Sequence, residues 1–220
     1  AMAASSDAAA ATAKLPVFVG FPDVPQLGLG LAALGRPGYI NLGRDGDIAP
    51  AEERSVEAMR ARAHEVLDAA YEAGVRYFDC ARSYGRAEEF LADWLRKRGL
   101  GSEDVAVGSK WGYRYTADWR VDTGGEPHEV KDHSLSHFLS QKAETLALLG
   151  DNLRLYQIHS ATQASGVLGD KDVLDALRDF KDKHGVRLGL SLSGVEQGDT
   201  LRKAIACDVF DAVQATYNLL

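Results

Sequence analysis

Short apolar runs alternate with longer amphipathic stretches along most of the chain, and this alternation constrains the fold more than any other sequence feature. Runs of strand length occur at 27–32, 75–79, 104–110, 153–159, 186–193 and 210–216. Helical patterns lie between them, at 56–74, 87–99, 134–150, 171–185 and 198–207. Strictly alternating strands and helices predict parallel strands joined by right-handed crossovers.

Two α/β folds have this pattern, and the first strand distinguishes them. A doubly wound nucleotide-binding sheet usually carries the spacing G-x-G-x-x-G directly after its first strand. Here Gly28 and Gly30 are followed by residues 31–33, Leu-Ala-Ala, so this spacing fails. The alternative is a (β/α)8 TIM barrel, whose chemistry lies on the loops that follow the strands.

The number of strands is low for a whole barrel, which typically takes about 250 residues. Five strand–helix units and a sixth strand fill the chain up to Leu220. The sequence therefore predicts either a barrel truncated after strand six or a fold that closes in another way. We expect residues 1–14, rich in alanine, to be a disordered tail, and residues 15–220 to form a single, incomplete barrel domain.

Composition excludes several functional classes. The chain is 45% hydrophobic and 26% charged, which is enough apolar material for a sizeable core. Its net charge of −7 argues against nucleic-acid binding, and no apolar run approaches the roughly 18 residues of a transmembrane helix. With only Cys80 and Cys207, a disulfide framework is not expected, and a reducing compartment such as the cytoplasm fits best, although an organelle remains an alternative.

Polar residues follow three consecutive predicted strands. Asp79 ends the second strand and Tyr84 lies in its loop, while Lys110 and His159 end the third and fourth strands. The ends of parallel barrel strands share one rim, so these four side chains should meet in one pocket. A lysine ammonium favours the phenolate and lowers the tyrosine pKa from about 10, a carboxylate orients the lysine, and a neutral imidazole can donate to a carbonyl oxygen. This set suits protonation of a carbonyl while hydride reaches its carbon.

Two further groups of residues were considered as sites. His133 and His137 could share a helix face, and His128 is nearby, but no acidic or cysteine pattern completes a ligand set, so no metal is expected. The long stretch after the third strand is rich in aromatic residues. Its residues Trp111, Tyr113 and Trp119 either wall a substrate pocket or pack the loop onto the barrel.

Five short motifs in order resemble the aldo-keto reductase superfamily: FDCARSYGRAE, GSKWG, YQIHS, RLGLSLSG and VQATYN. The resemblance extends from about Pro25 to Leu220. It implies a barrel that binds NADPH without a Rossmann fold and reduces aldehydes or ketones. A cytoplasmic enzyme with a small carbonyl substrate follows, with no nucleic-acid or membrane partner and an unassigned oligomeric state.

The resemblance also implies roles for individual residues. Tyr84 corresponds to the proton donor, Lys110 to the residue that tunes its pKa, Asp79 to the partner of that lysine, and His159 to the residue that orients the carbonyl. The corresponding cofactor-binding residues are Gly30, Leu31, Ser191 and Gln214. The superfamily also contains channel β-subunits, so a non-catalytic nicotinamide-binding protein is an alternative, as is an inactive fragment.

Overall fold

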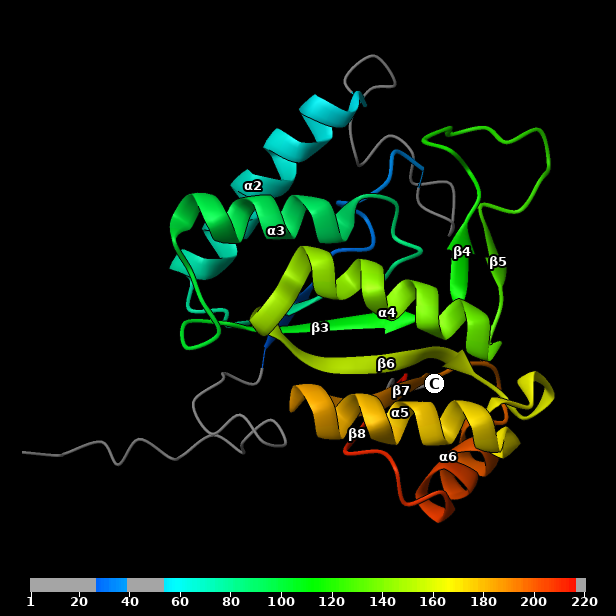
Figure 1. Ribbon diagram of the computed structural model, residues 1–220. Coiled ribbons are helices and arrows are strands. Elements are labelled where there is room, and N and C mark those ends of the chain that lie inside the picture. Colours follow the sequence, from blue (N-terminus) through cyan, green and yellow to red (C-terminus); the bar gives the residue numbers. More distant parts are fainter. Residues whose placement is uncertain (1–26, 39–53, 217–220) are drawn as a thin grey trace, which may run out of the picture.

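The computed structural model describes residues 27–38 and 54–216, so the predicted N-terminal tail lies outside the described residues. Its main element is a curved sheet of six parallel strands (Figure 1). In spatial order these are β1 (Gly28–Gly30), β2 (Tyr77–Asp79), β3 (Ala106–Trp111), β6 (Leu153–Ala161), β7 (Arg187–Leu192) and β8 (Ala212–Gln214). Each strand pairs with the next parallel strand along the chain, and the order never reverses. A doubly wound sheet reverses its order at a switch point, so this is the winding of a barrel.

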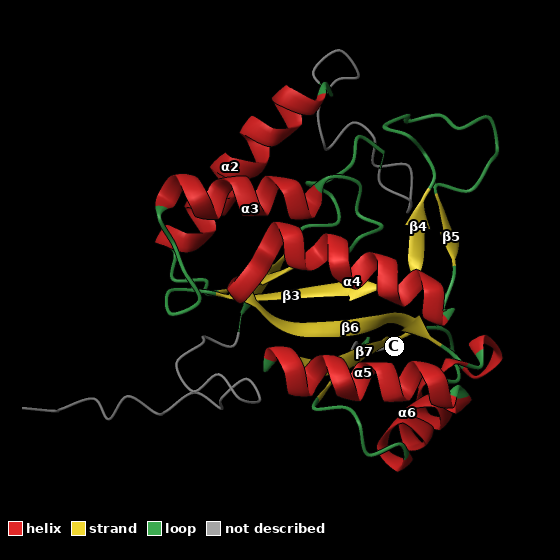
Figure 2. Cartoon of the chain, viewed as in Figure 1, coloured by secondary structure: helices red, strands yellow, loops and turns green. Residues whose placement is uncertain are grey.

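Five helices follow the strands and cover the outer face of the sheet (Figure 2). They are α2 (Val56–Glu72), α3 (Ala87–Arg98), α4 (Leu135–Leu149), α5 (Lys171–His184) and α6 (Gln197–Ala206). Local signals define their ends: the Ser55 and Ser134 hydroxyls cap the first turns of α2 and α4, and left-handed Gly99 and Gly185 end α3 and α5. Within the described ranges, none of the helices has the length and apolar character needed to cross a bilayer.

The two faces of the sheet have different surroundings because successive side chains in a strand point to opposite sides. Outward residues such as Phe78, Val107 and Ile158 pack with the helices in the main hydrophobic core. Inward residues Tyr77 and Leu155 belong to a separate small cluster that contains no helix residue. The inner face is therefore the barrel interior, and Asp79, Lys110, His159, Ser191 and Gln214 all occupy inward positions by this alternation.

The aromatic segment after β3 differs from the expected loop. Strands β4 (Tyr113–Tyr115) and β5 (Glu129–Lys131) pair in antiparallel fashion and form a hairpin at the carboxyl end of β3 (Figure 1). The pairing places Arg114 opposite Val130. Three-residue strands are too short to give a clear alternating pattern, which explains why the sequence did not predict them.

Candidate active site

Lys110 forms the centre of the polar cluster. Its side chain is only 2% exposed, and its ammonium forms a close ion pair with Asp79 Oδ2 and donates to the Cys80 carbonyl oxygen at 3.1 Å. Burial alone would lower the Lys110 pKa, but the charges of Asp79 and Tyr84 outweigh it and the pKa lies above its ordinary value. Lys110 is therefore a fixed, buried ammonium group.

Tyr84 lies beside this ammonium. The Lys110 Nζ atom is 5.1 Å from the centroid of the phenol ring, and the hydroxyl lies 3.5 Å from His159 Nε2. Burial raises the Tyr84 pKa, and the positive charge of Lys110 lowers it in part, so that the pKa stays above its ordinary value. Lys110 thus acts in the predicted direction, but desolvation of the phenolate is the larger effect in the protein alone.

His159 is held as a neutral imidazole. Burial and then the positive charge of Lys110 lower its pKa well below the ordinary value. Its Nδ1 lies 3.4 Å from the Ser83 hydroxyl, and its ring makes edge contacts with Tyr84 at 5.4 Å and Tyr113 at 5.0 Å between centroids. A neutral ring beside a phenol can orient a carbonyl oxygen without adding positive charge.

The predicted cofactor residues occupy the same end of the sheet. Gly30 is paired with Asp79, and among the described residues no heavy atom lies within 4 Å of the position that a Gly30 side chain would take. Ser191 is paired with Gln214; its hydroxyl accepts from the Ser160 backbone N–H at 2.8 Å, and the Gln214 side chain is exposed. Leu31 is fully buried, and its backbone N–H donates to the Asp79 carbonyl. Open space at Gly30 and an exposed amide at Gln214 fit a planar group that carries a carboxamide.

The three aromatic candidates separate. Tyr113 borders the cluster through His159. Trp111 is fully buried on the outer face, 4.9 Å from the ring of Phe138, because it follows the inward Lys110 in the same strand. Trp119 packs on Phe90 and donates to the Arg54 carbonyl at 2.9 Å. Both indoles are thus in packing positions, the second of the two alternatives that the sequence left open.

The structure adds Arg36, for which the sequence contains no distinguishing signal. Its guanidinium lies 5.3 Å from the Tyr84 ring centroid, donates to the Ser83 carbonyl at 3.3 Å and pairs with Glu129 of β5 at 3.3 Å. Arg36 therefore joins the loop after β1, the Tyr84 loop and the hairpin around one side of the cluster.

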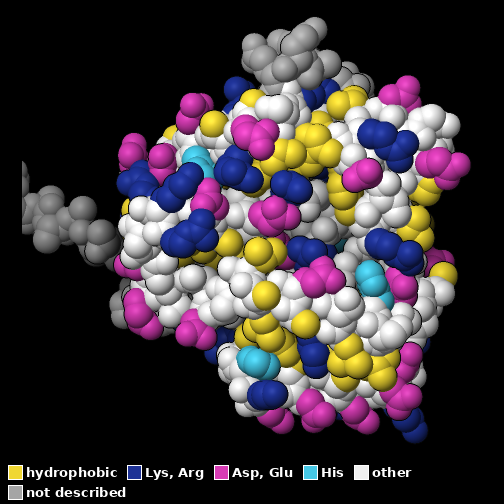
Figure 3. Space-filling model, turned by 45° about the horizontal axis from the view of Figure 1, so that its top comes forward, with side chains coloured by type: hydrophobic (Ala, Val, Ile, Leu, Met, Phe, Trp, Pro, Cys, Tyr) yellow, Lys and Arg dark blue, Asp and Glu magenta, His cyan; other side chains and the backbone are white. Residues whose placement is uncertain are grey.

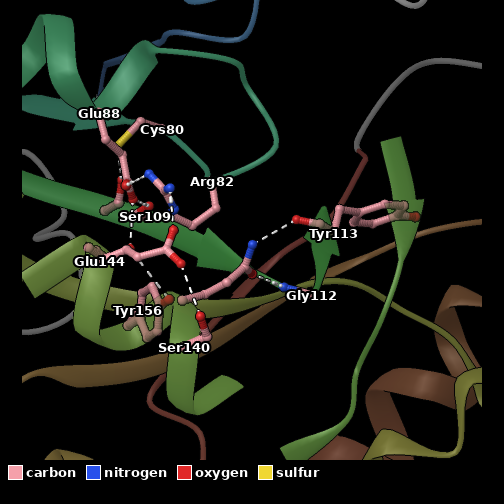
Figure 4. A network of polar contacts seen from close by, with 12 residues as sticks. Cys80, Arg82, Glu88, Ser109, Gly112, Tyr113, Ser140, Glu144 and Tyr156 are labelled. Carbon is pink, nitrogen blue, oxygen red and sulfur yellow. Dashed lines mark hydrogen bonds and ion pairs between the residues drawn. The ribbon is translucent and has the colours of Figure 1, made fainter. Parts of the chain in front are cut away.

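The Tyr84 loop is also held from the outer face by a buried polar network (Figure 4). Arg82 bonds Glu88 of α3 at 2.8 Å and also pairs with Glu144 of α4. Glu88, only 1% exposed, accepts in addition from the hydroxyls of Ser109 and Thr145. Burial opposes the charge of Arg82, but the two glutamates outweigh it and raise its pKa. The network links the loop that carries Tyr84 to β3, which carries Lys110.

Glu88→Gln should lower the free energy of unfolding by about 2–3 kcal/mol, because Arg82 would lose one of its two buried anions. Urea denaturation measures the change. The matched control is Glu89→Gln on the same helix, where the ion pair with Arg86 is 44–45% exposed and should contribute less than about 0.5 kcal/mol. Equal effects of the two substitutions would contradict the structural importance of the network.

His133 is a second buried imidazole behind the site, and it is engaged in a hydrogen bond within the protein. Its Nε2 donates to the backbone carbonyl of His159 at 2.9 Å. Burial lowers the His133 pKa to about 4. Among the described residues, no group of three or more metal-ligating side chains is found, so the histidines of this region are explained by packing and hydrogen bonds.

This shift predicts an acid-sensitive contribution to stability. Because the folded pKa is below the ordinary 6.5, the unfolded chain binds the proton more strongly, and stability falls as the pH drops from about 6.5 toward 4. After a discount for partial exposure, we expect His133 to contribute about 2 kcal/mol of this loss. Unfolding free energies of His133→Gln at pH 7 and pH 4 should differ less than those of the wild type. The exposed His184→Gln serves as control, and an unchanged pH dependence in His133→Gln would contradict the assignment.

The fold and the site together define a (β/α)-barrel protein in which a carboxylate, an ammonium, a phenol and an imidazole meet at the carboxyl ends of the strands. Comparison with known proteins specifies the family. The sequence model of the Aldo/keto reductase family matches residues 27–220, so the chain belongs to this family. The predicted family and the predicted barrel fold are both confirmed, and an oxidoreductase role follows in general terms.

Individual relatives agree with this assignment. The chain is 27% identical over 192 residues to "Aldo-keto reductase str7" of Strobilurus tenacellus, a match that covers 86% of this chain and 47% of the relative. A putative aldo-keto reductase from Pseudomonas aeruginosa has a TM-score of 0.62 at 27% identity, over 89% of this chain and 64% of that structure. The thermostable aldo-keto reductase Tm1743, at 21% identity and a TM-score of 0.57, is similar in fold. The chain thus spans about half the length of the curated relative and less than two thirds of these solved structures.

Proposed function

We propose that the protein reduces the carbonyl group of a small aldehyde or ketone to an alcohol, with NADPH as the hydride donor and Tyr84 as the general acid. The observation that carries the proposal is the continuous set of contacts from Asp79 through Lys110 and Tyr84 to His159. Each member has the character that the reaction requires: an anchored ammonium, a protonated phenol and a neutral imidazole.

When bound, NADPH supplies hydride to the carbonyl carbon. Gly30, Leu31, Ser191 and Gln214 would hold its nicotinamide end, because Gly30 leaves open space and Gln214 presents an exposed amide. The chain's own part is proton delivery. His159 Nε2 and the Tyr84 hydroxyl would converge on the carbonyl oxygen, and the Tyr84 proton would pass to that oxygen as negative charge develops on it.

Lys110 would stabilise the phenolate that Tyr84 becomes after giving up its proton. At 5.1 Å from the ring centroid, the buried ammonium acts in surroundings where a charge interaction is stronger than in water. The ring of Tyr113 and the hairpin that carries it would form one wall of the substrate pocket, since Tyr113 contacts His159. Both cysteines are free, which suits a reducing cytoplasm.

The space-filling view shows acidic and basic side chains interspersed over one face of the molecule (Figure 3). Such a mixed surface suits a small uncharged substrate that is recognised inside the barrel rather than at the surface.

Turnover with a panel of aldehydes and ketones, followed by the loss of NADPH absorbance, tests the proposal. Quenching of tryptophan fluorescence by NADPH is measured in parallel. We expect both saturable quenching and turnover. Quenching without turnover on any carbonyl would favour the alternative of a non-catalytic nicotinamide-binding protein, and the absence of both would reject the proposal.

A further inference from the structure

The carboxylate of Asp79 uses both of its oxygen atoms. One oxygen, Oδ2, pairs with Lys110, and the other, Oδ1, faces two donors inside the barrel. The Gln157 side-chain amide donates to Oδ1 at 3.3 Å, and the Tyr77 hydroxyl donates to it at 3.4 Å. Gln157 is 2% exposed and Tyr77 is 9% exposed, so water has little access to this side of the carboxylate.

Glycines on the neighbouring strands make room for the Tyr77 ring. A Cβ atom on Gly28 would lie 2.5 Å from Tyr77 Cδ1, and one on Gly108 would lie 2.2 Å from the Tyr77 hydroxyl oxygen. Gly28 is the register partner of Tyr77, and Gly108 is that of Asp79. The ring therefore lies in a slot in the barrel interior that larger side chains on β1 and β3 would close.

Gln157 has a similar seat. Its register partner on β7 is Gly189, and a Cβ atom there would approach Gln157 Cγ to 3.1 Å, closer than a relaxed contact. Glycine weakens a strand interior, and in strands it often marks a close approach of another group. Three glycines on three strands thus accommodate the two side chains that contact the free oxygen of Asp79.

We propose that Tyr77 and Gln157 are positioning residues that hold Asp79 in the orientation in which it anchors the Lys110 ammonium beside Tyr84. The role in catalysis rests on the proposed function. A buried carboxylate with a single partner can rotate about its side-chain bonds, whereas hydrogen bonds to its second oxygen remove that freedom. Burial and then the charge of Asp79 raise the Tyr77 pKa well above its ordinary value, so Tyr77 remains a phenol that can donate.

The test uses Tyr77→Phe and Gln157→Met, which remove one donor each and retain most of the side-chain volume. Each should lower kcat by about tenfold, as expected for one hydrogen bond to a charged group, with KM unchanged. The alkaline limb of the pH profile of carbonyl reduction should move to higher pH, because a less well anchored ammonium stabilises the Tyr84 phenolate less. Tyr71→Phe and Gln163→Met, away from Asp79, should show neither change.

A second measurement does not depend on turnover. NMR reports the exchange of the Lys110 ammonium protons with solvent, and the signal is assigned by its absence in Lys110→Met. Exchange should become faster in Tyr77→Phe and Gln157→Met and stay unchanged in the two controls. If the wild type reduces no carbonyl, the proposed function fails while this exchange still decides the positioning role.

The proposal is overturned if both variants keep wild-type exchange at Lys110. It is also overturned if they lose stability in urea while the exchange and the alkaline limb of the pH profile stay unchanged, since that result describes a packing role alone.

Discussion

Tyr84→Phe should lower kcat for carbonyl reduction by about 10²–10⁴-fold while leaving the affinity for NADPH nearly unchanged. The substitution removes one hydroxyl group, the only part of Tyr84 that can deliver a proton. The phenyl ring that remains keeps the packing against His159 and Lys110, whose contacts are made largely by the ring. Steady-state kinetics with NADPH and titration of tryptophan fluorescence measure the two quantities.

Tyr71→Phe is the matched control for this experiment. Tyr71 packs between Trp94 and Arg76 on the helical side of the barrel, so its hydroxyl has no part in the proposed chemistry. We expect wild-type kcat from this variant. Undiminished turnover in Tyr84→Phe would overturn its assignment as the acid, and a matching loss of NADPH affinity would indicate a binding role instead.

Lys110→Met should be damaging to both stability and activity. The free energy of unfolding should fall by about 3–5 kcal/mol, because the substitution leaves the carboxylate of Asp79 buried without its cation. Turnover should fall by at least about 10²-fold, since Tyr84 would have to form a buried phenolate without a neighbouring positive charge. Urea denaturation and steady-state kinetics measure these effects.

The double variant Asp79→Asn/Lys110→Met separates the two effects. It removes the uncompensated charge, so a large part of the lost stability should return, while activity should stay low because the ammonium is still absent. Additive losses of stability in the two single variants and the double variant would show that Asp79 and Lys110 do not interact. Lys131→Met is the control, because Lys131 is exposed and lies on the hairpin.

Much of the scaffold could be predicted from local patterns. The predicted helix at 171–185 corresponds to α5, Lys171–His184, because an Asp cap, an apolar stripe and a terminal glycine are all local features. The strand at 153–159 corresponds to β6, which extends two residues further. The cluster of Asp79, Lys110 and His159 was predictable in the same way, since parallel strands that alternate with helices place their carboxyl ends on one rim.

Other features depend on which face of the sheet a residue occupies. Trp111 looked as accessible in sequence as Tyr113, but it adjoins the inward Lys110 and therefore points outward into the core. Tyr77 and Gln157 are ordinary strand residues in sequence, and only the registers with Gly28 and Gly189 show that they contact the barrel interior and Asp79. The raised pKa of Tyr84 likewise reflects burial, which no local pattern reports.

By itself, the amino-acid sequence determined the succession of strands and helices, the family and the residue types at the strand ends, because periodicity, caps and motifs are properties of neighbours along the chain. Only the tertiary structure decided the hairpin after β3, the outward turn of Trp111 and the two donors on Asp79. These depend on pairing and burial between segments far apart in sequence, where a shift of a single residue in register moves a side chain from the barrel interior to the helical core.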